Sequence, residues 1–228
     1  MRVVETGSTN ADMLVLAAGG SVREGDWLVA ERQTAGRGRQ GREWSSPPGN
    51  LYASGLVMLR PTDPPAPTLA LVAGVATVEA LAMPELMLKW PNDVVYSRSL
   101  AKVAGILVER SDNNVVVGVG VNLAHAPDLT ERATAYLTAL GSIVSPQALV
   151  DILAATLTAR LTDWRADAGI IFSAWSARAH PMGTSLSAEI DGVRLEGAFS
   201  GLTPDGALQL RLPDGSFRVI HAGDVFLI

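Results

Sequence analysis

A pair of apolar segments separated by a polar turn constrains the fold of this chain most. Residues 103–109 (VAGILVE) and 115–121 (VVVGVGV) are rich in valine and other apolar residues, which favour β-strands. Residues 111–114 between them (SDNN) are typical of a turn. The pattern therefore predicts two strands joined in a hairpin.

The rest of the first 182 residues contains both strand-like and helix-like segments. Strands are predicted at 26–32, 51–59 and 86–90, and helices are predicted at 11–18, 68–82, 146–165 and 170–179. The spacing of Leu149, Leu153, Leu157 and Leu161 puts these side chains on one face of the longest helix. We expect an α+β domain over residues 1–182, with a mixed β-sheet and helices packed on one of its faces.

The sequence pattern changes after residue 182. Short strand-like segments alternate there with turns at 191–192 (DG), 204–206 (PDG) and 213–215 (PDG). Closely spaced strands and turns are typical of a small β-domain. We expect residues 183–228 to form a β-barrel-like C-terminal domain of roughly four or five strands.

The composition excludes several classes of protein. The 228-residue chain has no cysteine, so disulfides and cysteine metal sites are excluded, and its three histidines lie far apart. The formal net charge of −5 argues against a nucleic-acid-binding protein. The first residues lack the pattern of a signal peptide, and no apolar run is long enough for a membrane span. We therefore expect a cytoplasmic protein that binds neither nucleic acid nor a membrane.

Residues 36–44 (GRGRQGREW), called the arginine-rich loop below, are the most unusual local feature. Their glycines match the Gly-x-Gly-x-x-Gly fingerprint of dinucleotide-binding proteins, but that fingerprint must open a helix. Residues 45–50 (SSPPGN) cannot continue a helix, because they contain two prolines. A loop that binds carboxylate or phosphate, and becomes ordered when it does so, fits better. An ordinary surface loop is the remaining alternative, and three arginines within six residues of an acidic chain argue against it.

Five motifs in the same order resemble the catalytic domain of biotin–protein ligases. They are STN at 8–10, ERQTAGRGRQGREW at 31–44, KWPND at 89–93, KVAGILVE at 102–109 and GVGVNL at 118–123. The resemblance implies a class II synthetase-like catalytic fold followed by a small SH3-like β-barrel. Some members of the family carry an N-terminal DNA-binding domain, and we expect a catalytic-only form here because the chain starts with the strand that leads into the first motif.

The resemblance also implies a two-step reaction. The carboxylate of biotin attacks the α-phosphorus of ATP, which gives biotinyl-AMP and pyrophosphate. A lysine of a biotin carboxyl carrier domain then attacks this adenylate and releases AMP. Mg²⁺ would bridge phosphate oxygens, with Asp93 as its candidate protein ligand. Biotin, ATP and the carrier domain are thus the implied partners, and a homodimer is a family-based expectation.

The matched positions supply the candidate site residues. The catalytic candidates are Lys102, which would lie between the biotin carboxylate and the α-phosphate, Arg37 and Arg39. The candidates for binding biotin are Ser8, Thr9, Asn10, Gln33, Gly36, Arg37, Gly38, Arg39, Lys102, Gly105, Leu107 and Gly118. The candidates for binding the nucleotide are Arg39, Arg42, Trp44, Asn92, Lys102 and Asn122. Some have plainer interpretations, such as a helix cap for Ser8 and a turn for Asn92.

Two alternative functions stay open at this stage. A lipoate–protein ligase performs the same adenylate chemistry on a related fold, but its pocket does not need polar partners for a ureido ring. A non-catalytic regulatory module would bind biotin without the reaction. Such a module should have lost Lys102 or the arginine-rich loop, and the chain retains both.

Overall fold

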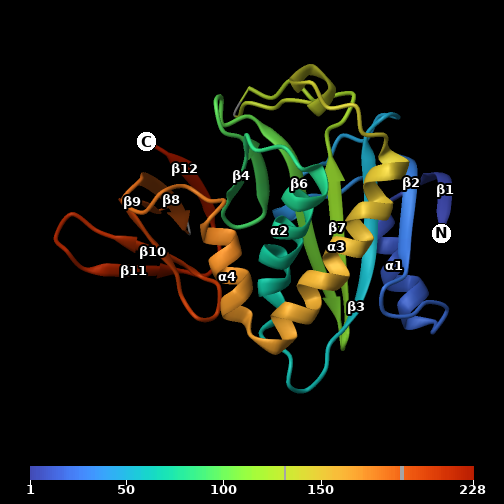
Figure 1. Ribbon diagram of the computed structural model, residues 1–228, viewed down its shortest axis with the longest axis horizontal. Helices are drawn as coiled ribbons and strands as arrows, with labels where there is room; N and C mark the ends of the chain where they lie inside the picture. The colour runs from blue at the N-terminus through green and yellow to red at the C-terminus, as the bar shows by residue number, and fades with distance from the viewer. Residues whose placement is uncertain (131, 191–192) are drawn as a thin grey trace.

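The computed structural model describes residues 1–130, 132–190 and 193–228, in which two β-sheets and four α-helices are present (Figure 1). The larger sheet contains the strands β1 (Arg2–Thr6), β2 (Trp27–Gln33), β3 (Leu51–Met58), β4 (Leu86–Lys89), β5 (Asp93–Tyr96), β6 (Lys102–Ser111) and β7 (Asn114–Val121). Their order is β1-β2-β3-β7-β6-β5-β4. The first pair is parallel and the others are antiparallel, so the expectation of a mixed sheet is confirmed.

The predicted hairpin lies in the middle of this sheet. β6 and β7 are joined by a two-residue turn at Asp112 and Asn113, and Asp112 has a left-handed backbone with φ of 53°. β3 pairs with the other edge of β7 from Leu51 to Met58. Because β7 is hydrogen-bonded on both edges and covered on both faces, its valines are buried, which explains its apolar sequence.

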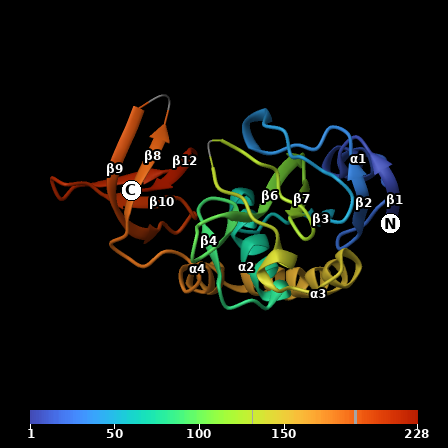
Figure 2. The same ribbon diagram turned by 90° about the horizontal axis from the view of Figure 1, so that it is seen from above.

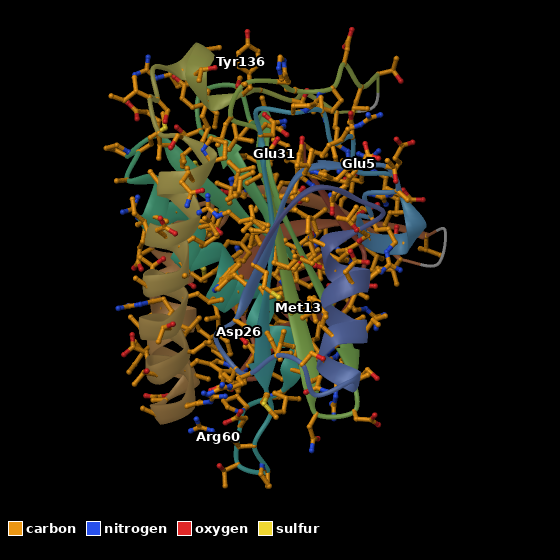
Figure 3. All side chains as sticks on the ribbon, turned by 90° about the vertical axis from the view of Figure 1, so that its right-hand side faces the viewer. Glu5, Met13, Asp26, Glu31, Arg60 and Tyr136 are labelled. Carbon is orange, nitrogen blue, oxygen red and sulfur yellow. The ribbon has the colours of Figure 1, made fainter. Side chains whose placement is uncertain are left out.

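Helices cover both faces of the sheet, so the expectation that they share one face is wrong. Figure 2 shows α2 (Leu69–Leu81), α3 (Pro146–Ala166) and α4 (Ala168–Ser176) on one side and α1 (Thr9–Ala18) on the other. Met13 of α1 packs with Leu56 and Val116, and Figure 3 shows Met13 between the helix and the sheet. The adjacent Val57 and Val115 belong instead to the core under α2 and α3, because neighbouring strand residues point to opposite faces.

The main core lies between the sheet and the three helices on that side. α2 is buried on nearly every face, since the sheet lies on one side of it and α3 and α4 lie on the other. Trp164 of α3 is fully buried, and its Nε1 donates to Thr68 Oγ1 at 2.8 Å. Within the described residues, none of the helices has the length and apolar character that crossing a membrane requires.

The second sheet is antiparallel and confirms a C-terminal β-structure of five strands. They are β8 (Ser185–Ile190), β9 (Val193–Leu202), β10 (Leu208–Arg211), β11 (Phe217–Ile220) and β12 (Asp224–Leu227), in the order β11-β10-β9-β8-β12. The turns predicted at 204–206 and 213–215 are present, and the turn predicted at 191–192 lies outside the described residues. Trp90 Nε1 donates to Gly206 O at 3.1 Å, which connects the two sheets.

Candidate active site

A cavity of about 650 Å³ lies between the larger sheet, the arginine-rich loop and β12. Among the residues that the structure describes, six cations and three carboxylates line it, in a chain whose net charge is −5. The cations are Arg37, Arg39, Arg42, Lys89, Lys102 and Arg132. This local excess of positive charge favours a ligand that carries negative charge. All candidate residues predicted from the sequence line the cavity except Gly36.

Three glycines form the floor of the cavity. Gly105 of β6 pairs with Gly120 of β7, and Gly118 lies two residues before Gly120 in the same strand. A Cβ atom on Gly118 would lie 2.8 Å from Asn10 Cγ, and one on Gly120 would lie 2.6 Å from Trp44 Cε2. Only glycine therefore lets the Asn10 amide and the Trp44 indole lie directly on the sheet.

One end of the cavity is polar and buried. Ser8, Thr9 and Asn10, at the start of α1, are 4–6% exposed. Ser8 caps the helix by accepting from the Ala11 amide, which explains why the three polar residues are held there in a fixed orientation. The Thr9 amide and hydroxyl both donate to Gln33 Oε1, at 2.9 and 3.0 Å. Neutral donors and acceptors of this kind suit a polar, uncharged group of a ligand.

Two residues that were not among the candidates complete this polar end. Ser54 of β3 is fully buried, and its hydroxyl lies 2.8 Å from Thr9 Oγ1 and 2.6 Å from Asn10 Oδ1. Glu109 Oε2 accepts from Asn10 Nδ2 at 2.8 Å, and its other oxygen lies 3.3 Å from Arg37 Nη2. Glu109 belongs to a matched motif, so its role at the site could have been predicted from the sequence. Ser54 lies in no motif, and no local sequence pattern indicates its role.

The arginine-rich loop has a closed, hairpin-like backbone. Arg37 and Glu43 form an isolated antiparallel bridge, and the Trp44 amide donates to Gly36 O at 2.9 Å. A short 3₁₀ turn, η1 (Arg39–Gly41), forms the tip. The chain continues into β3 rather than into a helix, so the context required by a dinucleotide-binding fingerprint is missing.

Lys102 lies at the opposite, cationic end of the cavity. Its Nζ is 2.6 Å from Asp93 Oδ1, and the two side chains are only 13% and 15% exposed. The same Nζ lies 5.1 Å from the centre of a Trp44 ring, in a cation–π contact. Asn122 Nδ2 donates to Ala135 O at 3.3 Å and approaches Lys102 O at 3.5 Å, so this side chain helps to hold the Lys102 backbone. Lys102 is thus held by its neighbours before any ligand arrives.

Arg39 reaches from the arginine-rich loop to two other parts of the chain. Its Nη1 donates to Asn92 Oδ1 at 3.3 Å, and its Nη2 donates to Gly223 O at 3.4 Å. Burial lowers the pKa of its guanidinium, although the charges of Asp224 and Asp93 oppose this shift. The charges of both carboxylates therefore stabilise the charged form of Arg39.

Arg42 forms an ion pair with Asp224 of β12, which fastens the arginine-rich loop to the smaller sheet. Burial alone would raise the pKa of Asp224, but the hydrogen bond and charge of Arg42, with the charge of Arg39, outweigh burial and lower it. Asp224 is therefore held as a carboxylate. Asp224 belongs to none of the matched motifs, and only the tertiary structure brings it to the cavity.

Lys89 is the other amine at this end. Its Nζ lies 5.5 Å from the centre of the Phe226 ring. Burial lowers the pKa of Lys89, Asp93 opposes that shift, and the charges of Arg132 and Lys102 add to it. Phe226 and Arg132 were not among the candidates predicted from sequence, since neither lies in a matched motif.

The described residues contain no group of three or more His, Cys, Asp and Glu side chains that could hold a metal ion. Mg²⁺ bound to a nucleotide does not need such a group, because phosphates and water fill most of its coordination sphere. Asp93, a cavity-lining carboxylate beside Lys102, fits the role of a single protein ligand.

Comparison with known proteins identifies the family. The model of the biotin/lipoate A/B protein ligase family matches residues 18–123, and that of the biotin protein ligase C terminal domain matches residues 189–228. The biotin–[acetyl-CoA-carboxylase] ligase of Paracoccus denitrificans is 38% identical over 220 residues, which cover 86% of this chain and 88% of the relative. The chain belongs to the biotin protein ligase family.

Other members of the biotin protein ligase family are similar along the same length. The biotin–[acetyl-CoA-carboxylase] ligase of Mycobacterium tuberculosis is 37% identical over 202 residues, or 83% of this chain and 74% of the relative. The structure of biotin protein ligase from Aquifex aeolicus in complex with biotin and ATP superposes with a TM-score of 0.87 at 25% identity. That match covers 100% of this chain and 98% of the other, so it includes both sheets.

Proposed function

We propose that this protein is a biotin–[acetyl-CoA-carboxylase] ligase. It activates biotin with ATP to biotinyl-5′-AMP and transfers the biotinyl group to a lysine of a biotin carboxyl carrier domain. The observation that carries the proposal is that one cavity joins a polar end, built mainly from neutral donors and acceptors, to a cationic end with Lys102. The names of the Paracoccus and Mycobacterium relatives and the biotin and ATP bound in the Aquifex structure support it.

The polar end would bind the ureido ring of biotin. The ring offers one carbonyl acceptor and two N–H donors, and the buried Thr9 and Asn10 and the half-buried Gln33 supply groups of both kinds. Leu107 and the Trp44 indole, which lies on Gly105 and Gly120, would line an apolar channel for the rest of the molecule. The carboxylate of biotin would then point along β7 towards Lys102 and the arginine-rich loop.

The first step brings two anions together, because the biotin carboxylate must attack the α-phosphate of ATP. Lys102 would lie between them and offset the charge that develops as the bond to phosphorus forms and pyrophosphate leaves. Arg37, which is paired with Glu109 in this structure, and Arg39 would add further positive charge, since both residues line the cavity. Asn92 would keep Arg39 in place through the hydrogen bond to Oδ1.

The nucleotide would occupy the space between Trp44, Asn122 and β12. The Trp44 indole presents an apolar surface for a base. Its Nε1 is a buried donor without a hydrogen-bond partner among the described residues, so a ligand acceptor would satisfy it. Asp93 would hold Mg²⁺ together with phosphate oxygens, and the ion would supply further neutralisation of the phosphate charge.

The second step needs an adenylate that is protected from water until the acceptor lysine arrives. The arginine-rich loop would provide this protection, because its ion pair with Asp224 holds it against β12 at the edge of the cavity. The amine of the carrier lysine then attacks the acyl carbon, and AMP leaves.

We further propose a homodimer that forms through the free edge of the larger sheet. β1 is the edge strand, and its Val3 and Val4 are 38% and 73% exposed. Figure 3 views the molecule from this edge. An unpaired edge strand that exposes two valines favours association with a second copy. Sedimentation at several concentrations tests this, and Val4→Lys should shift the protein to a monomer.

Residues 1–182 and 183–228 are proposed as two domains, which is supported by their separate sheets and by the separate family models. We propose a cytoplasmic location, where ATP and the carboxylase acceptor would be available.

Incubation with biotin, ATP, Mg²⁺ and a biotin carboxyl carrier domain tests the proposed function. Mass spectrometry of the carrier should show the addition of one biotinyl group, and the addition should require both ATP and biotin. The same assay with lipoate and its carrier domain should show no addition. Lipoylation without biotinylation would identify a lipoate–protein ligase instead, and biotin binding without either product would identify a non-catalytic module.

A further inference from the structure

The hydrogen bonds at the polar end of the cavity continue into the base of the arginine-rich loop. The link is Ser46, a buried residue that is 7% exposed and lies just beyond the loop. Its Oγ accepts from Gln33 Nε2 at 3.0 Å and donates to Trp44 O at 2.9 Å. One hydroxyl therefore contacts both a residue of the polar end and the last residue of the loop.

The direction of these hydrogen bonds follows from which atoms are able to donate. The Thr9 amide must donate, so the Gln33 atom that faces it must be the carbonyl oxygen. The Gln33 nitrogen then faces Ser46, whose oxygen must accept. The single proton of Ser46 is consequently free for the Trp44 carbonyl, which only accepts. No other arrangement of protons satisfies the Thr9 amide and the Trp44 carbonyl together.

The packing around Ser46 is as tight as its hydrogen bonding. A Cβ atom on Gly36 would lie 2.6 Å from Ser46 Oγ and 3.0 Å from Gln33 Nε2. The Trp44 amide donates to Gly36 O at 2.9 Å, so the two ends of the loop meet where Ser46 lies. This packing accounts for a glycine at position 36, which lies at the base of the loop and does not line the cavity.

We propose that Ser46 is a positioning residue that couples occupation of the polar end to closure of the arginine-rich loop. The inference rests on the proposed function, because the polar end is taken to bind biotin. With the hydroxyl present, the Gln33 carbonyl is held towards Thr9 and the base of the loop is held closed. Without it, the Gln33 amide is held through its oxygen alone, by Thr9, and the Trp44 carbonyl keeps no donor from this side chain. Biotin affinity and retention of the adenylate should therefore fall together.

The test compares Ser46→Ala with Ser187→Ala, a matched control. Ser187 is also a buried serine, 1% exposed, but it lies in β8 of the smaller sheet. Biotin affinity is measured by calorimetry, and the release of preformed biotinyl-AMP is measured by rapid filtration. We expect Ser46→Ala to weaken biotin binding by about 5- to 20-fold and to speed release by a similar factor, which is the effect of losing about one buried hydrogen bond. Ser187→Ala should match the wild type in both measurements.

A double-mutant cycle with Gln33→Ala separates positioning from general loosening of the structure. If Ser46 acts through Gln33, the biotin affinity of the double variant should be close to that of Gln33→Ala alone. If the effects of Ser46→Ala and Gln33→Ala on biotin affinity multiply in the double variant, the proposal is contradicted. It is also contradicted if Ser46→Ala alone keeps the biotin affinity and the adenylate release rate of the wild type.

A second variant keeps the proposal testable if Ser46→Ala does not fold. Gln33→Glu removes the donor towards Ser46, so the Ser46 proton turns to the new carboxylate and leaves the Trp44 carbonyl. Adenylate release should speed up, and unchanged release would contradict the inference. If the wild type itself forms no biotinyl-AMP, the proposed function fails. If it does form the adenylate and both variants behave like the wild type, only the role of Ser46 fails.

Discussion

The ammonium of Lys102 and the carboxylate of Asp93 form a close, largely buried ion pair, with 2.6 Å between Nζ and Oδ1. The two residues come from different strands, β6 and β5, whose pairing brings them together. Asp93 thus holds the lysine at the cationic end of the cavity and is also the proposed protein ligand of Mg²⁺.

Asp93→Asn separates these two roles. The change keeps the shape of the side chain and removes its charge, so we expect kcat for carrier biotinylation to fall by about 10- to 100-fold, as for loss of one preorganised charge. If Asp93 also binds the metal, the Mg²⁺ concentration needed for half-maximal activity should rise, which a Mg²⁺ titration measures. An unchanged Mg²⁺ requirement would restrict Asp93 to positioning Lys102.

Gly118→Ala tests the glycine floor. The added Cβ would displace the Asn10 amide, which lies against β7, and so disturb the polar end. We expect the KM for biotin to rise about tenfold or more while the KM for ATP changes little, because about 1–3 kcal/mol is the usual cost of overpacking. Gly7→Ala is the matched control, since a Cβ there meets no atom within 4 Å. Equal biotin KM values in the two variants would contradict this account of the floor.

Asp224→Asn tests whether the smaller sheet holds the arginine-rich loop. Arg42 would lose its carboxylate partner, and the loop would be held less firmly against β12. Because both side chains are about one third exposed, the loss should be modest, and we expect adenylate release to speed up about 2- to 5-fold. Glu196→Gln, an exposed change in β9, should leave release unchanged. Release at the wild-type rate in Asp224→Asn would mean that this ion pair does not retain the adenylate.

A separate ion-pair cluster stabilises the opposite end of the larger sheet, where Figure 3 shows Arg60 and Asp26. Arg165 of α3 donates twice to Glu24, at 2.8 and 2.7 Å, and its Nε lies 3.3 Å from Asp63. The Asp63 side chain is only 3% exposed. Arg165→Met would leave this carboxylate buried without a cation, so we expect a loss of about 3 kcal/mol in the free energy of unfolding, measured in urea. A loss below about 1 kcal/mol would show that water replaces the arginine.

The pH dependence of this cluster has a defined sign. The hydrogen bond from Arg165 lowers the pKa of Glu24 from its ordinary value of 4.5, although burial opposes the shift. Its stabilising contribution is therefore complete above the unfolded pKa and is lost as the pH falls through the lower, folded pKa. Glu24→Gln should be less stable than the wild type at pH 7, and the difference should disappear in acid. A stability difference that stays constant down to the lowest pH would contradict the linkage.

Much of the architecture follows from local sequence patterns. The hairpin of β6 and β7, the long helix α3 and the turns of the smaller sheet are all where valine-rich segments, leucine spacing and Pro-Asp-Gly turns predict them. These patterns depend on neighbouring residues only, so they can be recognised without the tertiary structure. β5 was missed, because its four residues directly follow the apparent turn at Asn92 and are too short to show a period.

Tertiary relationships were harder to predict. The sequence of α1 marks a helix with a serine cap, but its apolar residues do not say which face of the sheet it covers. The motifs likewise name Arg42 and Gln33, whereas their partners Asp224 and Ser46 belong to no matched motif. Such pairs depend on how distant segments pack, and the chain of hydrogen bonds through Ser46 became visible only in the folded structure.

Biotin-dependent exchange of pyrophosphate into ATP tests the central claim most directly, because it reports adenylate formation without any carrier domain. The wild type should catalyse exchange with biotin and not with lipoate. Lys102→Gln should lower the exchange rate by about 100-fold or more while thermal unfolding shows an intact fold, since the lost charge acts on the transition state. Exchange at the wild-type rate in Lys102→Gln, or exchange supported by lipoate and not by biotin, would contradict the account.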